Sequence, residues 1–416
     1  MHPVIEAIWR IESARLIAGL TRVVGDIGTA EELAQDALVA ALEQWPAQGV
    51  PERPGAWLMG TAKHRAIDLV RRRKTLERKH EEIGRDLERD QDSLELDAID
   101  EEVGDDLLGL IFTACHPVLS KDARVALTLR VVGGLTTEEI ARGFLVPVST
   151  VAQRIVRAKR TLAEAHVRFE VPAGADRDAR LASVLEVIYL IFNEGYSATA
   201  GEYWVRPALC EEALRLGRIL AELTPTEPEV HGLVGLMEIQ ASRLGARVGP
   251  SGEPILLLDQ DRARWDRLLI RRGLAALGRA ERLGALRPYG LQAAIAACHA
   301  RATTAEETDW ARMVGLYDAL VQLAPSPVVE LNRAVAVGMA FGPASGLDLV
   351  DALVNEPALK SYHLLSAVRG DLLRKLGRSE EARVEFERAA SLTENVRERD
   401  LLHRRAAECA AERMAG

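Results

Sequence analysis

Between Leu119 and Leu162, three apolar segments with helical spacing are separated by two short breaks, and this stretch constrains the fold more than any other. Apolar residues recur about every 3.6 positions in each segment, which predicts three helices. Thr136 or Thr137 is expected to cap the second helix and Ser149 the third. The residues between these two helices, Leu145–Val148, suffice only for a tight turn, and their proline cannot continue a helix. The pattern predicts a helix-turn-helix, a motif whose later helix enters a DNA major groove.

The third predicted helix carries polar and basic side chains on its outer face. Such side chains hydrogen-bond to base edges, with about 1–3 kcal/mol of discrimination for a good bidentate pair, and the basic ones neutralise phosphate. The alternative is a solvent-exposed helix with an ordinary polar face. The turn, the caps and the basic end favour DNA binding. The candidate residues are Ser149, Thr150, Gln153, Arg154, Arg157, Lys159 and Arg160.

The composition of the 416 residues favours helices throughout. Ala, Leu, Arg and Glu are abundant and aromatic residues make up 4% of the chain, so we expect an all-α protein of two or three domains. The formal net charge of −9 argues against a chain that binds DNA strongly by itself. Either its DNA contacts are local and weak, or a larger basic partner supplies the electrostatic attraction.

The sequence contains no pattern that predicts catalysis. Neither a Ser/His/Asp arrangement nor a phosphate-binding glycine run is present, so we expect no enzyme activity and no cofactor. No secretory signal and no run of about 20 apolar residues occurs, which predicts a soluble, cytoplasmic protein without membrane contact. Four cysteines lack metal-ligand spacing, so we expect reduced thiols and no metal site. They are Cys115, Cys210, Cys298 and Cys409.

Two amphipathic helices are predicted at the start of the chain, over Val4–Val24 and from Thr29 to Trp45. The second has an apolar inner face and an acidic outer one. An acidic stripe either faces solvent or docks on a basic surface. The residues placed on the outer face are Glu31, Glu32, Gln35, Asp36 and Glu43.

A stiff loop, Pro46–Pro54, leads into a predicted helix over Gly55–Lys79 with a basic side and a basic end. Positive charge at a helix C-terminus is favoured by the helix dipole alone. The density of charge here also suits an unstacked single DNA strand. The basic residues are Lys63, His64, Arg65, Arg71, Arg72, Arg73 and Lys74.

These motifs together resemble a known family. AEELAQDALVAALEQW followed by PGAWLMGTAKHRAIDLVRRRK is similar to region 2 of the sigma-70 family, and Leu119–Leu162 is similar to its region 4. Both regions in this order, joined by a short linker without region 3, resemble the extracytoplasmic-function (ECF) group. The resemblance implies a region 2 helical bundle over 1–75, an acidic linker over 76–106 and a region 4 helix-turn-helix over 107–170.

The resemblance also implies partners and contact residues. It implies a sigma factor that binds the clamp coiled coil and the flap of core RNA polymerase and directs promoter recognition. The polymerase would then supply the electrostatic attraction to DNA, which this negatively charged chain lacks. The implied core-binding residues are Glu32, Leu33, Gln35, Asp36 and Leu38. Those for the minus-ten element are Gln48, Arg53, Lys63, His64, Arg65, Arg71, Arg72 and Arg73, with His64 standing where many relatives carry Asn. The seven candidates on the third helix would read the minus-thirty-five element.

The acidic stretch Glu77–Asp106 is predicted to be a flexible, solvated linker. The family resemblance adds a second possibility, in which the linker threads near the polymerase active-site cleft and its carboxylates mimic nucleic acid.

Residues 177–416 read as helical pairs with short breaks. Ser361–Leu392 is close to a tetratricopeptide (TPR) unit, Ser326–Val354 is predicted to be the preceding unit, and Arg312–Pro325 a helix of a further one. This layout resembles a subgroup of sigma factors with a C-terminal TPR-like domain in place of a separate anti-sigma factor. The resemblance implies a regulatory role and a possible small YCII-related partner protein.

Two stretches interrupt the helical pattern, Tyr189–Trp204 with several aromatics and the Gly/Pro-containing Leu244–Trp265. Each is either a ligand or partner site, or a core patch and connecting loop. Two further functions also fit the whole chain. One is a one-component regulator that binds duplex DNA without polymerase and senses a ligand or protein through its repeats. The other is a scaffold with a vestigial helix-turn-helix.

Overall fold

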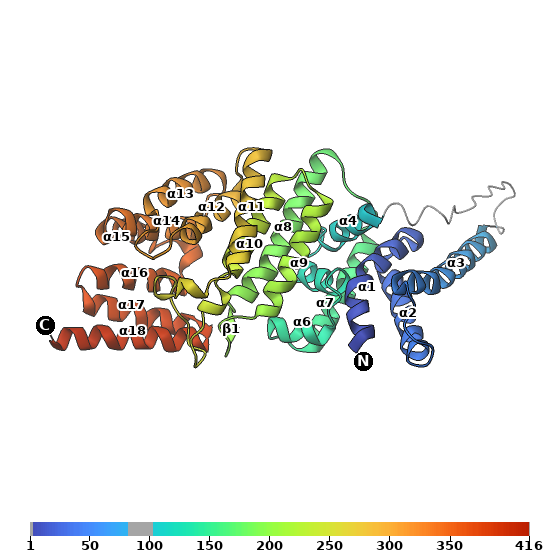
Figure 1. The fold of residues 1–416 in the computed structure, drawn as a ribbon, viewed down its shortest axis with the longest axis horizontal. Coiled ribbons are helices and arrows are strands. Elements are labelled where there is room, and N and C mark those ends of the chain that lie inside the picture. The colour runs from blue at the N-terminus through green and yellow to red at the C-terminus, as the bar shows by residue number, and fades with distance from the viewer. Residues whose placement is uncertain (1–2, 82–102, 416) are drawn as a thin grey trace. The chain divides into compact units, whose positions relative to one another are not determined.

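The computed structural model describes residues 3–81 and 103–415 and divides the chain into two compact units, Met1–Ile188 and Tyr189–Gly416. The all-α prediction is confirmed. Across the described ranges the strands are confined to two short segments, β1 (Ala200–Gly201) and β2 (Glu394–Asn395) (Figure 1). Most of the predicted acidic linker lies in residues 82–102, outside the described residues. No helix in the described ranges is long and apolar enough to span a bilayer.

Three helices form the N-terminal part of the first unit. Asp26 caps the second of them, because its carboxylate accepts a hydrogen bond from the Thr29 backbone N–H at 2.7 Å. This helix therefore begins at Ile27, two residues before the predicted start. It also continues through Pro46, so the predicted loop is shorter than expected. The helices are α1 (Pro3–Val24), α2 (Ile27–Gln48) and α3 (Pro54–Glu81).

The three helices predicted between Leu119 and Leu162 are present, and a further helix precedes them. Thr136 caps one of them in a reciprocal capping box with Glu139, as predicted. The predicted cap at Ser149 is wrong, because the following helix already begins at Val148 and its capping position is held by Pro147, which offers no side-chain acceptor. The helices are α4 (Val103–Ala114), α5 (Lys121–Val131), α6 (Thr137–Phe144) and α7 (Val148–Glu164).

Helix α8 (Gly174–Tyr196) is shared between the two units, and its first half packs on α5. The guanidinium of Arg124, a residue only 7% exposed, lies 3.2 Å from Glu186 and donates to Ser183 Oγ. Ser183 Oγ in turn donates to the Cys115 carbonyl at 2.6 Å. The compact units therefore divide at Ile188, beyond the predicted start of the extension at residue 177.

The second unit consists of helices connected by short breaks. Its antiparallel neighbours pack closely enough that small residues lie at the crossings. A Cβ on Gly346 of α15, for example, would stand 2.8 Å from the Gly338 backbone of α14. The helices are α9 (Pro207–Leu223), α10 (Pro228–Ala241), η2 (Leu244–Ala246), η3 (Leu257–Asp259), η4 (Arg262–Arg264), α11 (Arg267–Leu283), α12 (Pro288–Arg301), α13 (Trp310–Leu323), α14 (Pro327–Phe341), α15 (Pro343–Leu353), η5 (Pro357–Leu359), α16 (His363–Lys375), α17 (Ser379–Leu392) and α18 (Val396–Ala415).

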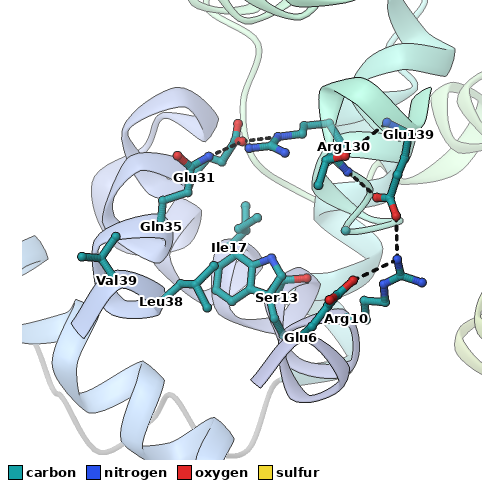
Figure 2. A pocket seen from close by; sticks show the side chains of 13 residues that line it. Glu6, Arg10, Ser13, Ile17, Glu31, Gln35, Leu38, Val39, Arg130 and Glu139 are labelled. Atoms are coloured by element: carbon teal, nitrogen blue, oxygen red, sulfur yellow. Dashed lines mark hydrogen bonds and ion pairs between the residues drawn. The ribbon is translucent and has the colours of Figure 1, made fainter. Parts of the chain in front are cut away.

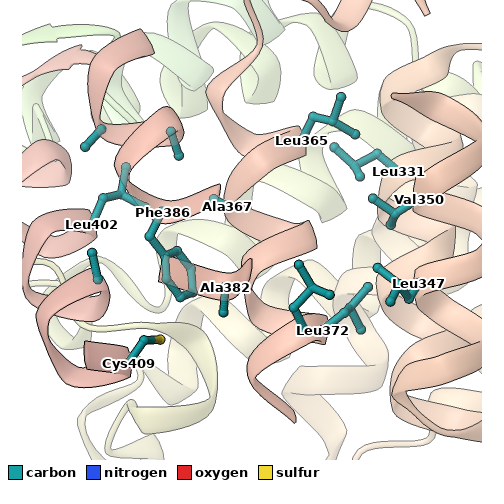
Figure 3. Packing of buried hydrophobic residues seen from close by; sticks show 14 of the residues in the cluster. Leu331, Leu347, Val350, Leu365, Ala367, Leu372, Ala382, Phe386, Leu402 and Cys409 are labelled. Atoms are coloured by element: carbon teal, nitrogen blue, oxygen red, sulfur yellow. The ribbon is translucent and has the colours of Figure 1, made fainter. Parts of the chain in front are cut away.

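The predicted helical pair of Ser361–Leu392 corresponds to α16 and α17, which lie side by side with α18 (Figure 1). Their shared core is built around Phe386 of α17, which is fully buried against Leu372, Leu402 and other apolar side chains (Figure 3). The helix boundaries therefore agree with the repeat pattern. The assignment of α16 and α17 to the TPR family stays a prediction.

A parallel bridge joins the two strands of the second unit, with Ala200 opposite Glu394 and Gly201 opposite Asn395. Asn395 is fully buried, and its side-chain amide donates to the carbonyls of Ala198 and Tyr203, both at 3.0 Å. The buried amide thus fixes the loop after α8 to the start of α18.

We expect the stability of the chain to fall in acid because of one buried histidine. Burial, together with the charges of Arg243 and Arg262, lowers the pKa of His299 to about 3. The unfolded group titrates near 6.5, so between these values the unfolded chain binds the extra proton. The free energy of unfolding should therefore decrease by up to ~1.4 kcal/mol per pH unit as the pH drops below 6.5, and should not depend on this group above it.

Urea unfolding of the full chain at a series of pH values measures this slope. His299→Gln keeps a polar side chain without the titration and should flatten the slope between pH 6.5 and 4. An identical slope in both proteins would contradict the prediction.

Candidate nucleic-acid interface

The outer face of α7 is open to solvent. Ser149, Gln153 and Arg157 lie one turn apart on the helix and are all exposed. The preceding turn is tight because Leu145 adopts the left-handed conformation with φ of 50°. Its backbone N–H donates to Ala141 and ends α6. The structure therefore brings these three predicted side chains onto one surface, with Thr150 half-buried beside them.

The remaining basic residues of α7 are engaged by carboxylates. Arg154 contacts Asp122 of α5 at 2.7 Å, and Arg160 contacts Glu164 one turn later at 2.6 Å. Lys159 forms an ion pair with Glu31 of α2. The first two pairs lie on the surface, where solvent screens them, so they hold these side chains only weakly. The third connects the predicted region 4 to the predicted region 2.

Glu31 is the centre of this connection, and the prediction that it faces outward is wrong. It is only 4% exposed, and its Oε1 accepts from Arg130 Nε of α5 at 2.6 Å and from Gln35 Nε2 at 2.8 Å. Lys159 pairs with the other oxygen. Burial raises the pKa of Glu31, but the charges and hydrogen bonds of Lys159 and Arg130 lower it by more, so the net pKa lies below its ordinary value. Glu31 is therefore ionised at neutral pH and binds two cations of the other region.

Two further ion pairs join the same regions. Arg10 of α1 contacts Glu139 of α6 at 2.6 Å, and Arg22 of α1 contacts Asp106 of α4 at 3.3 Å. Figure 2 shows Arg10, Glu139, Glu31 and Arg130 around one cavity of about 280 Å³. The walls of this cavity come from α1 and α2 on one side and from the end of α5, the turn after it and α6 on the other.

The predicted core-binding residues of α2 border this cavity. Glu32 and Asp36 are exposed. Gln35 and Leu38 are half-buried and line the cavity (Figure 2). Leu33 is 7% exposed and belongs to the buried core, so its side chain supports this face from inside and is not part of the exposed surface. The predicted polymerase-facing surface thus lies directly beside region 4.

The predicted minus-ten residues lie on the end of α2, the loop after it and α3. Trp45 before the loop and Trp57 after it pack edge to face, with ring centroids 5.3 Å apart. Arg65 contacts Asp36 at 2.8 Å, and His64 Nδ1 lies 2.7 Å from the Gly60 carbonyl. Gln48 is the last residue of α2, and Lys63 is half-buried. Four of the other predicted residues are exposed: Arg53, His64, Arg65 and Arg71. Arg72 and Arg73 lie on α3, and their side chains are outside those described.

Sequence reasoning missed the pairing of Glu31 with Arg130. Arg130 was a weak signal, since it stands in the mostly apolar run VALTLRVV, where a buried arginine requires a partner. The partner could not be identified, because it lies 99 positions away in the sequence.

The chemistry of the described residues outside this interface offers no metal site. In the ranges 3–81 and 103–415, no group of three or more His, Cys, Asp or Glu side chains is placed to hold a metal ion. Burial raises the pKa of the Cys115 thiol to about 12, so it stays protonated at neutral pH.

Comparison with known proteins assigns both helical regions. Residues 10–75 match sigma-70 region 2, and residues 110–162 match sigma-70, region 4. The two matches support a sigma-70 family factor. The chain has the two domains of a sigma factor, and such domains bind core RNA polymerase and promoter DNA. A further match, over residues 180–281, is to a family of unknown function (DUF6596), which covers the first part of the extension.

Two relatives show how far the similarity extends. The chain is 44% identical over 384 residues to Uncharacterized protein R00370 of Rhizobium meliloti, which covers 92% of this chain and 90% of that protein. It is 27% identical over 176 residues to the Probable ECF RNA polymerase sigma factor SigI of Mycobacterium tuberculosis, which covers 42% of this chain and 60% of that protein. The first relative therefore shares the extension as well as the sigma regions.

Proposed function

We propose that this chain is an ECF sigma factor that binds core RNA polymerase through α2 and recognises the minus-ten element through α3 and the minus-thirty-five element through α7. The observation that carries this proposal is the exposed row of Ser149, Gln153 and Arg157 on the second helix of a helix-turn-helix that matches region 4. The match to region 2 supports the polymerase contact. A protein with this role acts in the cytoplasm and needs no catalytic residues of its own.

The closed arrangement of regions 2 and 4 is proposed to be the resting form. Lys159 is held by Glu31, and the α2 surface around Gln35 and Leu38 borders region 4. Binding to polymerase and to the minus-thirty-five element then requires these contacts to separate. Shifting such an equilibrium from about 1% to 99% open takes roughly 5.5 kcal/mol of differential binding, which one protein interface can supply.

The helical extension is proposed to regulate this step. Relatedness over the whole chain to a second long protein supports an extension that works together with the sigma regions. A small YCII-related protein is one candidate partner for it. A one-component regulator with a sensing extension is the second candidate function, and it differs by binding duplex DNA without polymerase.

Run-off transcription on a promoter library, together with gel shifts with and without core polymerase, tests the proposal. We expect a shift and transcripts only when core polymerase and this chain are both present. Binding to duplex DNA by the chain alone, with no effect of core enzyme, would favour the one-component regulator instead.

Arg157→Ala is expected to weaken promoter binding of the polymerase complex by about tenfold, because an exposed arginine at a DNA surface contributes about 1–3 kcal/mol. If Arg157 contacts a phosphate, the slope of log affinity against log salt should also decrease by about one. Filter binding at four salt concentrations measures both quantities. Arg388→Ala removes the same charge from an exposed position of α17 and should leave affinity and slope unchanged. Equal effects of the two substitutions would rule out a specific contact.

A further inference from the structure

The two segments that interrupt the helical pattern of the extension meet in the second unit. Arg247, which follows η2, stacks over Tyr196 at the end of α8, with its Cζ 3.7 Å from the ring centroid. The same guanidinium lies 5.5 Å from the ring centroid of Trp204 and donates to the Tyr196 carbonyl at 3.0 Å. The sequence separates these residues by about 50 positions, and the fold joins them in one cation–aromatic cluster.

A second arginine belongs to the same cluster. Arg243 is 8% exposed, and its Cζ lies 5.8 Å from the ring centroid of Tyr196 and 5.7 Å from that of Trp265. Trp265 itself is 3% exposed. Two guanidinium groups therefore share one aromatic ring in the interior of the unit.

Neither cation has a negatively charged partner within residues 3–81 and 103–415. The Nε atoms of Arg243 and Arg247 and the indole nitrogen of Trp265 are buried and have no hydrogen-bond partner. A nearby arginine shows the usual solution, since Arg206 pairs with Glu194. In the cluster, three of the buried unsatisfied atoms are donors only, and the fourth, the Tyr196 hydroxyl oxygen, can donate or accept.

This arrangement is costly without a ligand. Buried charges are normally paired, and a buried donor without an acceptor loses its hydrogen bonds to water without replacing them. Cation–π contacts offset only part of this free-energy cost. Burial lowers the pKa of Arg247, Tyr196 raises it, and the second cation Arg243 lowers it again. An acceptor-only, negatively charged group would satisfy the donors and both charges together.

We propose that Arg243, Arg247 and Trp265 form a binding site for a small oxyanion, either a phosphate or a carboxylate group. Guanidinium groups match both through a planar fork of donors. One side of the cluster reaches the surface, since Arg247 and Trp204 are only half-buried. The loop that carries Trp204 is held in place by Asn395. The site lies in the segment that matches a family of unknown function and does not depend on the proposed role of regions 2 and 4.

Thermal unfolding of the full chain with sodium phosphate, sodium acetate or sodium chloride at matched ionic strength tests the proposal. We expect a saturating increase in the melting temperature with phosphate or with acetate, and the stronger of the two identifies the anion class. Chloride should give only the general salt effect. Arg247→Gln should weaken the anion effect at least tenfold, whereas Arg271→Gln, at an exposed position of α11, should leave it unchanged.

A second variant distinguishes a loss of anion binding from misfolding. Arg243→Lys keeps the buried charge but loses the fork, and it should also weaken anion binding. Because Arg247 is an uncompensated cation, Arg247→Gln should be as stable as the wild type in the absence of anion. The proposal fails if no anion exceeds the chloride effect in the wild type, or if the anion effect is equal in all four proteins.

Discussion

Replacing Glu31 with glutamine should separate regions 2 and 4. The substitution removes the charge that holds both Arg130 and Lys159, whose side chains are 24% and 22% exposed. Loss of one partner from a fully buried ion pair costs 3–5 kcal/mol, and partial hydration of these two cations reduces this to about 1–3 kcal/mol. We therefore expect the open fraction to increase by about tenfold or more.

Spin labels at Gln44→Cys of α2 and Ala163→Cys of α7 measure the separation by pulsed electron resonance, because both positions are exposed and all four natural cysteines are buried. Glu31→Gln should broaden the distance distribution and extend it to longer distances. Glu43→Gln makes the same chemical change at an exposed site of α2 and should not.

The same substitution also tests whether the closed form is the resting form. If it is, Glu31→Gln should bind core polymerase more tightly than the wild type. A distance distribution identical to that of the wild type would show that Glu31 does not hold the regions together. A distribution extended to longer distances without tighter polymerase binding would confirm that Glu31 holds the two regions together. It would contradict the proposal that the closed form is the resting form.

Removing α8 should destabilise region 4 strongly. A fragment that ends at Phe169 loses Ser183 and Glu186, which bind Arg124, and it exposes the carbonyl of Cys115. We expect a decrease of about 2–4 kcal/mol in the free energy of unfolding, since a nearly buried cation loses its partners. Urea unfolding followed by circular dichroism measures this difference against a fragment that ends at Tyr196.

The matched control is the longer fragment with Ser183→Ala and Glu186→Gln. It keeps all of α8 but loses the polar contacts, so its stability should lie between those of the two fragments. Equal denaturation midpoints for the fragments ending at 169 and 196 would show that α8 is not part of region 4. The outcome matters for any study of the extension. If a fragment that ends at residue 169 is unstable, a change in its activity would reflect the instability of region 4 and not the loss of regulation.

Much of this fold could be predicted from local pattern. The boundaries of α16 and α17 follow from apolar spacing and from the break at Leu376 and Gly377, and the capping box of α6 follows from Thr136 and Glu139. These features depend on residues within one or two helical turns. The start of α7 was predicted two residues late, because Pro147 and Ser149 are both acceptable at a helix start and only the backbone decides between them.

The candidate site was less predictable because it depends on distant pairings. Exposure of Ser149, Gln153 and Arg157 follows from helical periodicity alone. The burial of Glu31 does not, since an acidic residue next to Glu32 on an amphipathic helix normally faces water. Its environment is created by α5 and α7, and no periodic signal in the sequence reports a contact between separate domains.

The buried amide of Asn395 has a consequence for how the extension unfolds. Open repeat arrays contact only their neighbours, so they can fray from either end. Here one side chain joins residues almost 200 positions apart, from Ala198 to the beginning of the last helix. Losing α18 would therefore release the loop at the beginning of the extension, so we expect the first and last parts of the extension to unfold together in one cooperative step.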